Sequence, residues 1–150
     1  VADVEAALDE ERAWRLVHVA CHGVVDPSRP ERSGLVLSGP TLWTADAVAS
    51  RRLRARLVVL SACDSGRGMA APGEGLLGLP RAFLWAGAER VVASLWPVDD
   101  RATAEFFETF HGHHLGAGVE ASRALRETQR ELASAGTDPH RWAAFAIWGQ

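Results

Sequence analysis

In Leu16-Val17-His18-Val19-Ala20-Cys21-His22-Gly23, an apolar run ends at a histidine and a glycine. A second run, Leu57-Val58-Val59-Leu60-Ser61-Ala62-Cys63-Asp64-Ser65-Gly66, ends in a similar way beyond a cysteine. Short apolar and β-branched runs that stop at a glycine-containing turn are typical of strands, and the lack of polar alternation suits strands buried on both faces. Both runs are therefore predicted to be central strands of a parallel sheet.

The ends of these two runs carry a base and a thiol. Ligands of an open parallel sheet bind beyond the carboxyl ends of its strands, so His22 and Cys63 are expected to face one cleft although they lie far apart in the sequence. A cysteine that meets a distant histidine in this way is a candidate nucleophile with its base.

Strands and helices alternate along the rest of the chain, as an α/β fold requires. Strands are predicted at residues 16–20, 34–37, 57–62, 90–95 and 142–148. Helices are predicted at residues 4–14, 45–50, 76–86, 101–111 and 119–133, with Thr44 as the cap of the second. Because no internal repeat or composition break interrupts this pattern, residues 1–150 are predicted to form a single domain.

Five blocks of sequence carry a resemblance to a known family. In chain order they are Ala20-Cys21-His22-Gly23, Leu60-Ser61-Ala62-Cys63, residues 73–88, residues 91–100 and Trp142-Ala143-Ala144-Phe145. Together they resemble the CHAT domain, a caspase-like bacterial peptidase domain often attached to TPR repeats. The resemblance covers nearly the whole chain from Leu16 to Gly149. It implies a caspase-like three-layer α/β/α sandwich with a mostly parallel sheet.

The resemblance also implies an activity, that of a cysteine endopeptidase. A free thiol has a pKa of roughly 8.5, so a neighbouring imidazole is needed to form the thiolate at neutral pH. Cys63 would attack the peptide carbonyl and His22 would protonate the leaving amine, with an acyl-thioester between the two steps. In the family the backbone N–H groups of the residues matching Gly23 and Cys63 hold the oxyanion.

Substrate preference is expected to come from acidic residues near the cleft. Asp99 and Asp100 end a segment similar to a separase motif whose acid faces a basic substrate side chain, although Pro97 replaces an acid of that motif. Either aspartate is equally suited to cap the helix that follows. Asp64, directly after the thiol, is a third candidate for binding substrate.

Composition excludes several classes of function. With 16 basic and 19 acidic residues the formal net charge is −3, which predicts no nucleic-acid partner. No apolar run approaches the roughly 20 residues of a membrane span, and the first residues lack the pattern of a secretory leader. Two cysteines do not make a disulfide framework, so a reducing cytoplasm is the expected location.

The expected partners are a protein substrate and a regulatory repeat or sensor segment. Because the chain opens on Val1 rather than on methionine, we expect it to be a fragment of a longer multidomain protein that supplies this segment. No cofactor and no metal are expected. Nitrogen and sulfur ligands suit zinc, but the spacing of a set formed by His18, Cys21, His22 and Cys63 matches no common zinc module.

Two other classes of function remain open at this stage. The domain is alternatively a catalytically silent caspase-like scaffold or recruitment module, although the intact dyad argues against that. A flavodoxin-like ligand-binding domain is the third interpretation. It would need a glycine-rich phosphate loop after the first strand, and the residues following Gly23 have no such pattern.

Overall fold

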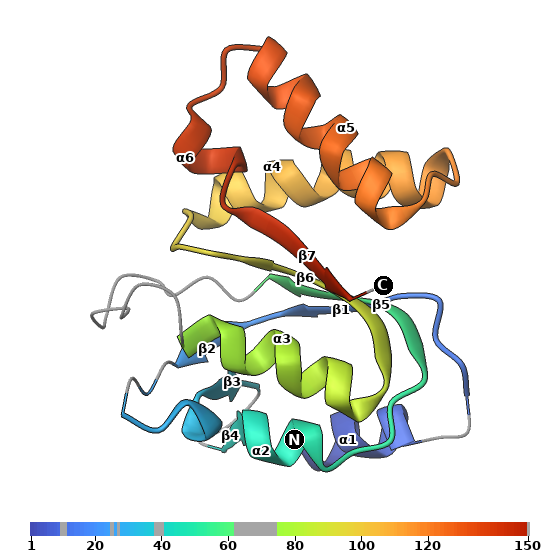
Figure 1. Ribbon diagram of the computed structural model, residues 1–150, viewed down its shortest axis with the longest axis vertical. Coiled ribbons are helices and arrows are strands. Elements are labelled where there is room, and N and C mark those ends of the chain that lie inside the picture. The colour runs from blue at the N-terminus through green and yellow to red at the C-terminus, as the bar shows by residue number, and fades with distance from the viewer. Residues whose placement is uncertain (10–11, 25, 27, 38–40, 62–74, 150) are drawn as a thin grey trace.

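The computed structural model describes residues 1–149 except 10–11, 25, 27, 38–40 and 62–74. A four-stranded sheet runs through the middle of the molecule in the order β1-β5-β6-β7 (Figure 1). Its strands are β1 (Val17–Ala20), β5 (Ala55–Ser61), β6 (Ala88–Ser94) and β7 (Phe145–Gly149). The first three are parallel and β7 is antiparallel to β6, which confirms the prediction of a mostly parallel sheet.

Helices cover both faces of this sheet (Figure 1). On one face lie α1 (Ala2–Asp9), α2 (Ala45–Ala49) and α3 (Gly75–Ala86). On the other lie α4 (Asp100–His111), which runs into a π-helical turn at Gly112–Gly116, α5 (Ala121–Ser134) and the short α6 (Pro139–Trp142). The predicted three-layer α/β/α sandwich is therefore confirmed.

Side chains of the central strands pack into two hydrophobic cores, one on each face of the sheet. In β5, Val58 and Leu60 pack in the core beneath α1, α2 and α3, whereas Leu57 and Val59 pack against α4 and α5. Successive side chains of a strand point to opposite faces, so a strand covered on both sides must be apolar at every position. This is the physical reason for the continuous apolar run in the sequence.

A second, three-stranded antiparallel sheet lies beside α1 and α2 and was not predicted as such. It consists of β2 (His22–Val24), β3 (Gly34–Val36) and β4 (Leu42–Thr44), with a 3-10 turn at Pro30–Arg32. Of these three strands only β3 was expected, within the predicted strand at residues 34–37. Trp43 anchors this sheet: its ring is buried, and its indole Nε1 donates to Glu5 Oε1 at 3.1 Å.

The predicted first helix, residues 4–14, is too long. Helix α1 spans Ala2–Asp9, and Trp14 is in extended conformation beside the start of β5. There the Trp14 N–H donates to the Arg54 carbonyl at 2.7 Å, and the Arg56 N–H donates to the Trp14 carbonyl at 3.0 Å. Backbone pairing with a neighbouring strand thus replaces helix at the end of the predicted segment.

Individual residues explain the start of α2 and the end of α3. Thr44 caps α2, as predicted, by accepting from the Ala47 N–H. Helix α3 ends at Gly87, whose φ of 115° is the left-handed conformation that glycine adopts without strain. A Cβ at Gly87 would lie 2.2 Å from the Leu53 carbonyl oxygen, so this close approach also requires glycine. Among the helices of the described residues, none is long and apolar enough to cross a membrane.

Candidate active site

A cavity of about 260 Å³ lies at the carboxyl ends of β1 and β5. Its walls come from the bend between β1 and β2, the last residue of β5 and the first turns of α4. The lining residues are Ala20, Cys21, His22, Ser61, Asp100, Thr103 and Ala104. Because Ala20 and Ser61 are register partners at the ends of adjacent parallel strands, the cavity occupies the place where such sheets bind ligands.

His22 reaches this cavity because the first strand breaks. β1 ends at Ala20, the chain bends at Cys21, and His22 opens β2 opposite Val36. The imidazole side chain is exposed as well as lining the cavity. A histidine in this position is open both to a bound molecule and to water, as a general acid and base must be.

The other half of the predicted dyad lies outside the described residues. Cys63 and Asp64 belong to the segment 62–74, so their distances from His22 are not part of the described structure. Ser61, two positions before Cys63, ends β5 at the cavity wall. The nucleophilic role of Cys63 and the substrate-binding role of Asp64 stay predictions.

Cys21 is a second thiol at the same cavity. It is a half-buried free cysteine, and burial raises the pKa of its thiol. A thiol with a raised pKa is mostly protonated at neutral pH and is a weak nucleophile. This environment fits the expectation that Cys21 fills space beside the sheet.

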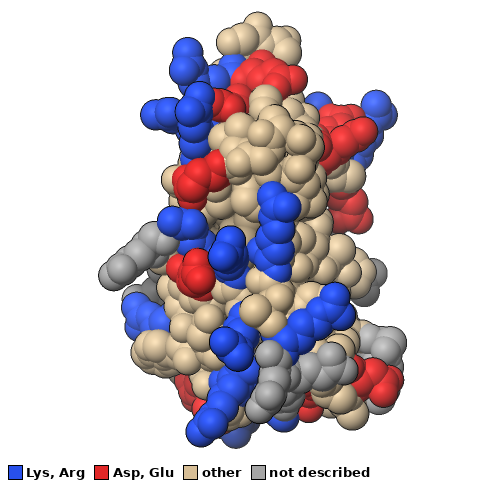
Figure 2. Space-filling model, turned by 90° about the vertical axis from the view of Figure 1, so that its right-hand side faces the viewer, with Lys and Arg blue, Asp and Glu red and all other residues tan. Residues whose placement is uncertain are grey.

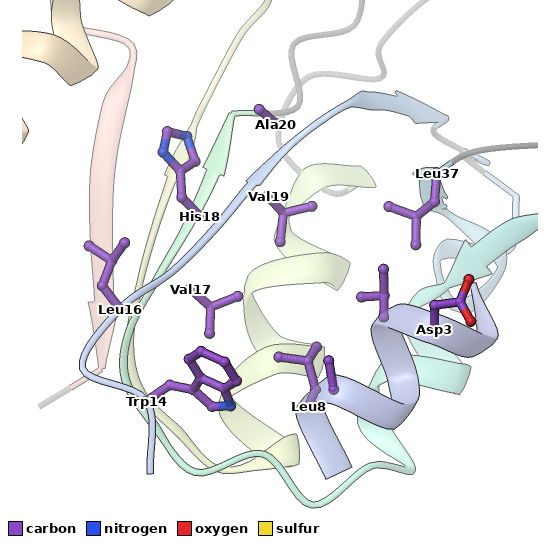
Figure 3. A pocket seen from close by; sticks show the side chains of 11 residues that line it. Asp3, Leu8, Trp14, Leu16, Val17, His18, Val19, Ala20 and Leu37 are labelled. Carbon is purple, nitrogen blue, oxygen red and sulfur yellow. The ribbon is translucent and has the colours of Figure 1, made fainter. Parts of the chain in front are cut away.

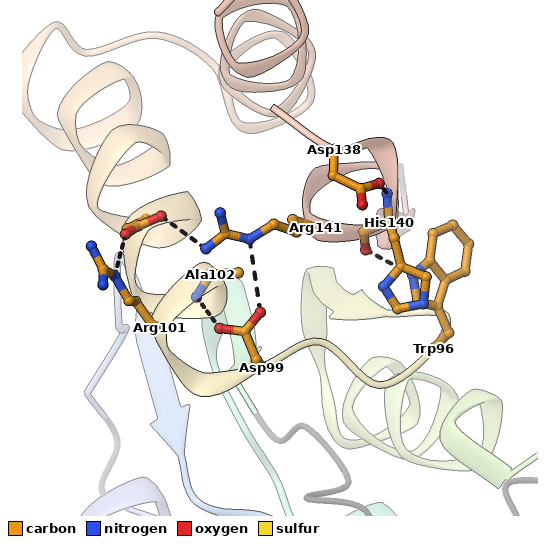
Figure 4. Close-up of polar contacts among 8 residues, drawn as sticks. Trp96, Asp99, Arg101, Ala102, Asp138, His140 and Arg141 are labelled. Atoms are coloured by element: carbon orange, nitrogen blue, oxygen red, sulfur yellow. Dashed lines mark hydrogen bonds and ion pairs between the residues drawn. The ribbon is translucent and has the colours of Figure 1, made fainter. Parts of the chain in front are cut away.

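The two neighbouring aspartates occupy different surroundings. Asp99 is the N-cap of α4: its Oδ1 accepts from the Ala102 N–H at 2.9 Å, and its Oδ2 lies 3.8 Å from Arg141 Nε (Figure 4). The guanidinium of Arg141 also lies 3.3 Å from Glu105, which ties α6 to α4. Asp100 is exposed and lines the cavity. The capping role thus belongs to Asp99, and only Asp100 shares a cavity with His22.

Gly23 follows His22 in β2 and pairs with Leu35 of β3. The pairing of β2 with β3 therefore holds the backbone that follows His22 in place. Its predicted role as an oxyanion donor depends on the position of Cys63 and stays a prediction.

A histidine pair that the sequence did not reveal lies between β1 and the end of α4. His18 Nδ1 is 3.1 Å from His111 Nε2, and the ring of Phe107 contacts both imidazoles. Burial, and then the neighbouring His111, lower the pKa of His18 to about 4. Burial, and then His114, lower the pKa of His111. Both rings are thus neutral at pH 7, and one donates a hydrogen bond to the other.

This pairing separates His18 from the zinc set considered above. His18 contacts His111 at the end of α4, whereas Cys21 and His22 line the cavity at its beginning. Within the part of the chain that the structure describes, no three side chains of the metal-ligating types converge on one point.

A mostly parallel sheet between two helical layers, with a histidine just beyond the end of β1, is the architecture of a caspase-like α/β domain and is consistent with that class. Comparison with known families agrees with this class. The family model described as the CHAT domain matches residues 1–150, and the chain belongs to this family.

Two curated relatives are tetratricopeptide repeat protein 28 from mouse and from human. They are 38% and 37% identical to the chain over 110 residues, which is 72% of its length. The chain spans about 4% of the length of either relative.

Proposed function

We propose that this domain is a cysteine endopeptidase in which Cys63 is the nucleophile and His22 the general acid and base. The observation that carries the proposal is the cavity at the carboxyl ends of β1 and β5. It joins the exposed imidazole of His22 to Ser61, from which the chain continues directly to Cys63. Membership of a caspase-related family adds support.

The proposed reaction has two stages. The Cys63 thiolate attacks the scissile carbonyl carbon, a C–S bond forms, and the carbonyl electron pair moves to oxygen. When this pair returns, the C–N bond breaks, and His22 gives its proton to the leaving amine. His22 then takes a proton from water, the resulting hydroxide adds to the thioester, and the C–S bond breaks to release the acid and restore the thiol.

In this proposal the backbone N–H groups of Gly23 and Cys63 stabilise the oxyanion that forms in each stage. The pairing of β2 with β3 supports the role of Gly23, because a backbone fixed by a sheet does not have to reorganise during the reaction. No step needs a metal or a cofactor.

For substrate binding we propose Asp100, with Asp64 as a second acid beside the nucleophile. The carboxylate of Asp100 lies at the cavity of His22, where it would attract an arginine or lysine side chain of the substrate. The contacts of Asp99 favour a structural role in place of the substrate-binding role considered for it. At about 260 Å³ the cavity is somewhat smaller than the roughly 300–1,000 Å³ of typical ligand pockets.

Regulation by another segment is the second part of the proposal. The curated relatives are named for tetratricopeptide repeats, and the chain corresponds to a small part of them. We propose that a repeat or sensor segment controls access to the site and that the reaction takes place in a reducing cytoplasm. The bacterial origin expected from the resemblance stays a prediction, since both of these relatives are mammalian.

A catalytically silent scaffold is the alternative candidate. The names of the two relatives describe repeats and not an enzyme, which favours it. The small volume of the cavity also suits the capture of one side chain better than the binding of a long peptide.

Covalent labelling tests the peptidase proposal. Fluorescent peptidyl acyloxymethyl ketones with Arg, Lys, Leu or Asp at the first position are incubated with the wild type and with Cys63→Ala, His22→Ala and Cys21→Ala. We expect both dyad variants to lose labelling and Cys21→Ala to keep it, because the Cys21 thiol is half-buried and protonated. Asp100→Asn should weaken labelling by the Arg and Lys probes and spare the Leu probe.

The control for Asp100 is Asp46→Asn, which removes another exposed acid from α2 on the opposite face of the sheet. If no probe labels Cys63 while iodoacetamide still alkylates it, the scaffold proposal replaces the peptidase. Because the lack of an activator would also prevent labelling, the probe experiment is repeated in the presence of the proposed repeat or sensor segment.

A further inference from the structure

A cavity of about 190 Å³ lies between α2 and α3, on the face of the central sheet opposite α4. Figure 1 shows these two helices side by side on that face. Half of the lining residues are alanine or glycine, and their short side chains leave space between the helices. The lining residues are Glu31, Ala45, Asp46, Ala49, Gly78, Arg81, Ala82 and Trp85. The larger side chains among them decide what the cavity can bind.

Trp85 lines this cavity from the last turn of α3. With 72% of its surface exposed, it is the most exposed of the large hydrophobic side chains in the described part of the chain. Arg81 lies about one helical turn before Trp85, on the same side of α3, and is exposed as well. An exposed tryptophan beside a cavity is typical of a contact site, because tryptophan contributes much of the binding energy at protein interfaces.

A larger cavity of about 540 Å³ runs along β1 beside α1, and its tryptophan differs from Trp85. Figure 3 shows Trp14 beside Leu8 at one end of that cavity. Trp14 is half-buried, and the guanidinium carbon of Arg12 lies 4.5 Å from its ring centroid. The guanidinium carbon of Arg81 lies 5.9 Å from the ring centroid of Trp85, close to the limit of roughly 6 Å for a cation–π contact. The ring of Trp85 is thus open to another cation.

Two carboxylates line the cavity together with Trp85. Glu31 belongs to the 3-10 turn at Pro30–Arg32, and Asp46 to the first turn of α2. Both are exposed, and within the described residues neither forms an ion pair with a basic side chain. Since Arg81 is the one basic residue of the lining, the cavity carries an excess of negative charge. A cationic side chain from outside would give these carboxylates a partner.

The charges elsewhere on the surface favour the same kind of partner. Figure 2 shows basic side chains gathered over the middle and lower part of the face on which β1 and β5 begin. That face repels a basic group, whereas the carboxylates of the cavity attract one. Opposite charges across an interface speed the encounter of two proteins and fix their orientation. The charge pattern therefore favours a partner that presents a basic group to the cavity.

We propose that the cavity between α2 and α3 binds a lysine or arginine side chain of a partner protein. The aliphatic stem of that side chain packs on Trp85, and its cationic head lies at Glu31 and Asp46. At about 190 Å³ the cavity is smaller than the roughly 300–1,000 Å³ of small-molecule sites, and so it suits a single side chain. The remaining affinity comes from contacts around Trp85, which only a macromolecular partner supplies. The proposal does not depend on the peptidase activity.

Fluorine NMR of the 150-residue chain labelled with 5-fluorotryptophan tests this site. The chain has six tryptophans, and Trp85→Phe identifies the Trp85 resonance. The probes are short peptides of Gly, Ser and Ala whose central residue is Lys, Arg, Leu or Glu, with a leucine on either side of it. We expect the Lys and Arg peptides to shift the Trp85 resonance and to bind at least about fivefold more tightly than the Leu and Glu peptides, with weaker binding at high salt.

Fluorescence polarisation of a labelled Lys peptide separates the contributions of the lining residues. Trp85→Ala should weaken binding by about tenfold, and Asp46→Asn and Glu31→Gln each by about threefold. Arg81→Gln should strengthen binding by about twofold, because it removes the cation that competes for the Trp85 ring. Glu108→Gln, which changes an exposed acid of α4, is the matched control and should bind like the wild type. All of these side chains are exposed, so each variant is expected to keep its fold.

Each of four results would overturn the proposal. If Arg81→Gln weakens binding, or the Glu peptide binds best, the cavity receives an acidic group. If the Leu peptide binds as tightly as the Lys peptide, Trp85 acts as an apolar contact without the carboxylates. If spermidine binds as tightly as the Lys peptide, the ligand is a small polycation and not a protein. If no peptide shifts the Trp85 resonance, the cavity does not receive a basic side chain.

Discussion

The imidazoles of His18 and His111 join β1 to α4 through a hydrogen bond of 3.1 Å between Nδ1 and Nε2. β1 leads to His22 and α4 begins with Asp100, so the pair connects the two elements that form opposite walls of the cavity. The bond requires one imidazole to accept, and an imidazolium has no acceptor nitrogen. The contact between these walls therefore depends on at least one neutral ring.

Acid should weaken the fold through this pair. Because the folded-state pKa of His18 lies near 4, below its ordinary value of 6.5, the unfolded chain binds more protons between these pH values. Stability is thus complete above about pH 6.5 and falls as the pH is lowered toward 4. Since His18 keeps an exposed edge, we expect a loss of about 1 kcal/mol, less than the full shift would give.

Urea unfolding of the wild type and of His18→Gln at several pH values measures this effect. The variant should lose less stability between pH 7 and 4.5 than the wild type. His140→Gln is the control, because this exposed histidine lies in α6 away from the pair. If the free energy of unfolding depends equally on pH in the wild type and in His18→Gln, protonation of the pair does not affect stability.

The neighbouring aspartates of α4 should differ in their effect on stability. Asp99→Ala removes the acceptor of the Ala102 N–H and the contact with Arg141, and is expected to cost about 1 kcal/mol. Asp100→Ala removes an exposed carboxylate that is not the cap and should cost less than about 0.5 kcal/mol. Chemical denaturation of both variants at pH 7 makes the comparison, and a reversed order would assign the cap to Asp100.

Cys21 should alkylate slowly. In a Cys63→Ala variant it is the one remaining thiol of the sequence, and burial raises its pKa. Its reaction with iodoacetamide at pH 7 should be several-fold slower than that of an unstructured cysteine peptide, and should speed up as the pH rises above 8. Mass spectrometry at timed intervals follows the reaction. Rapid labelling at pH 7 would mean that the thiol has an activated environment.

Gly87 should tolerate no side chain. Gly87→Ala forces a left-handed φ on alanine and places a Cβ against the Leu53 carbonyl, so we expect a loss of roughly 2–3 kcal/mol. Gly116→Ala is the matched control, because no atom lies within 4 Å of its added Cβ. Thermal unfolding of the two variants should show a large decrease only for Gly87→Ala. A small decrease there would mean that the turn after α3 can move.

The central strands and the helix α4 could be predicted from the sequence because long apolar runs are compatible with few kinds of secondary structure. Strands β5 and β6 and helix α4 were predicted near their actual positions, and His22 lies just beyond the end of β1, close to its predicted place. Strands β2 and β4 were missed, whereas β3, which is equally short, was expected within residues 34–37. The sequence did not decide whether Asp99 or Asp100 caps α4, because both are aspartates and differ only in their position relative to the start of the helix.

Contacts that depend on tertiary structure were beyond sequence reasoning. His18 and His111 are 93 positions apart, and no spacing rule joins them. The backbone path, which composition does not encode, creates this contact.

The two-sided burial of β5 affects how the chain finds its register. Leu57, Val58, Val59 and Leu60 are all apolar, so a slip by one residue would leave three of these four core positions apolar and bring Arg56 or Ser61 to the fourth. Hydrophobicity within the run therefore does little to select the native alignment. It must be selected by the shapes of the side chains and by the strand ends, and a misaligned chain would carry Ser61 away from the cavity that it shares with His22.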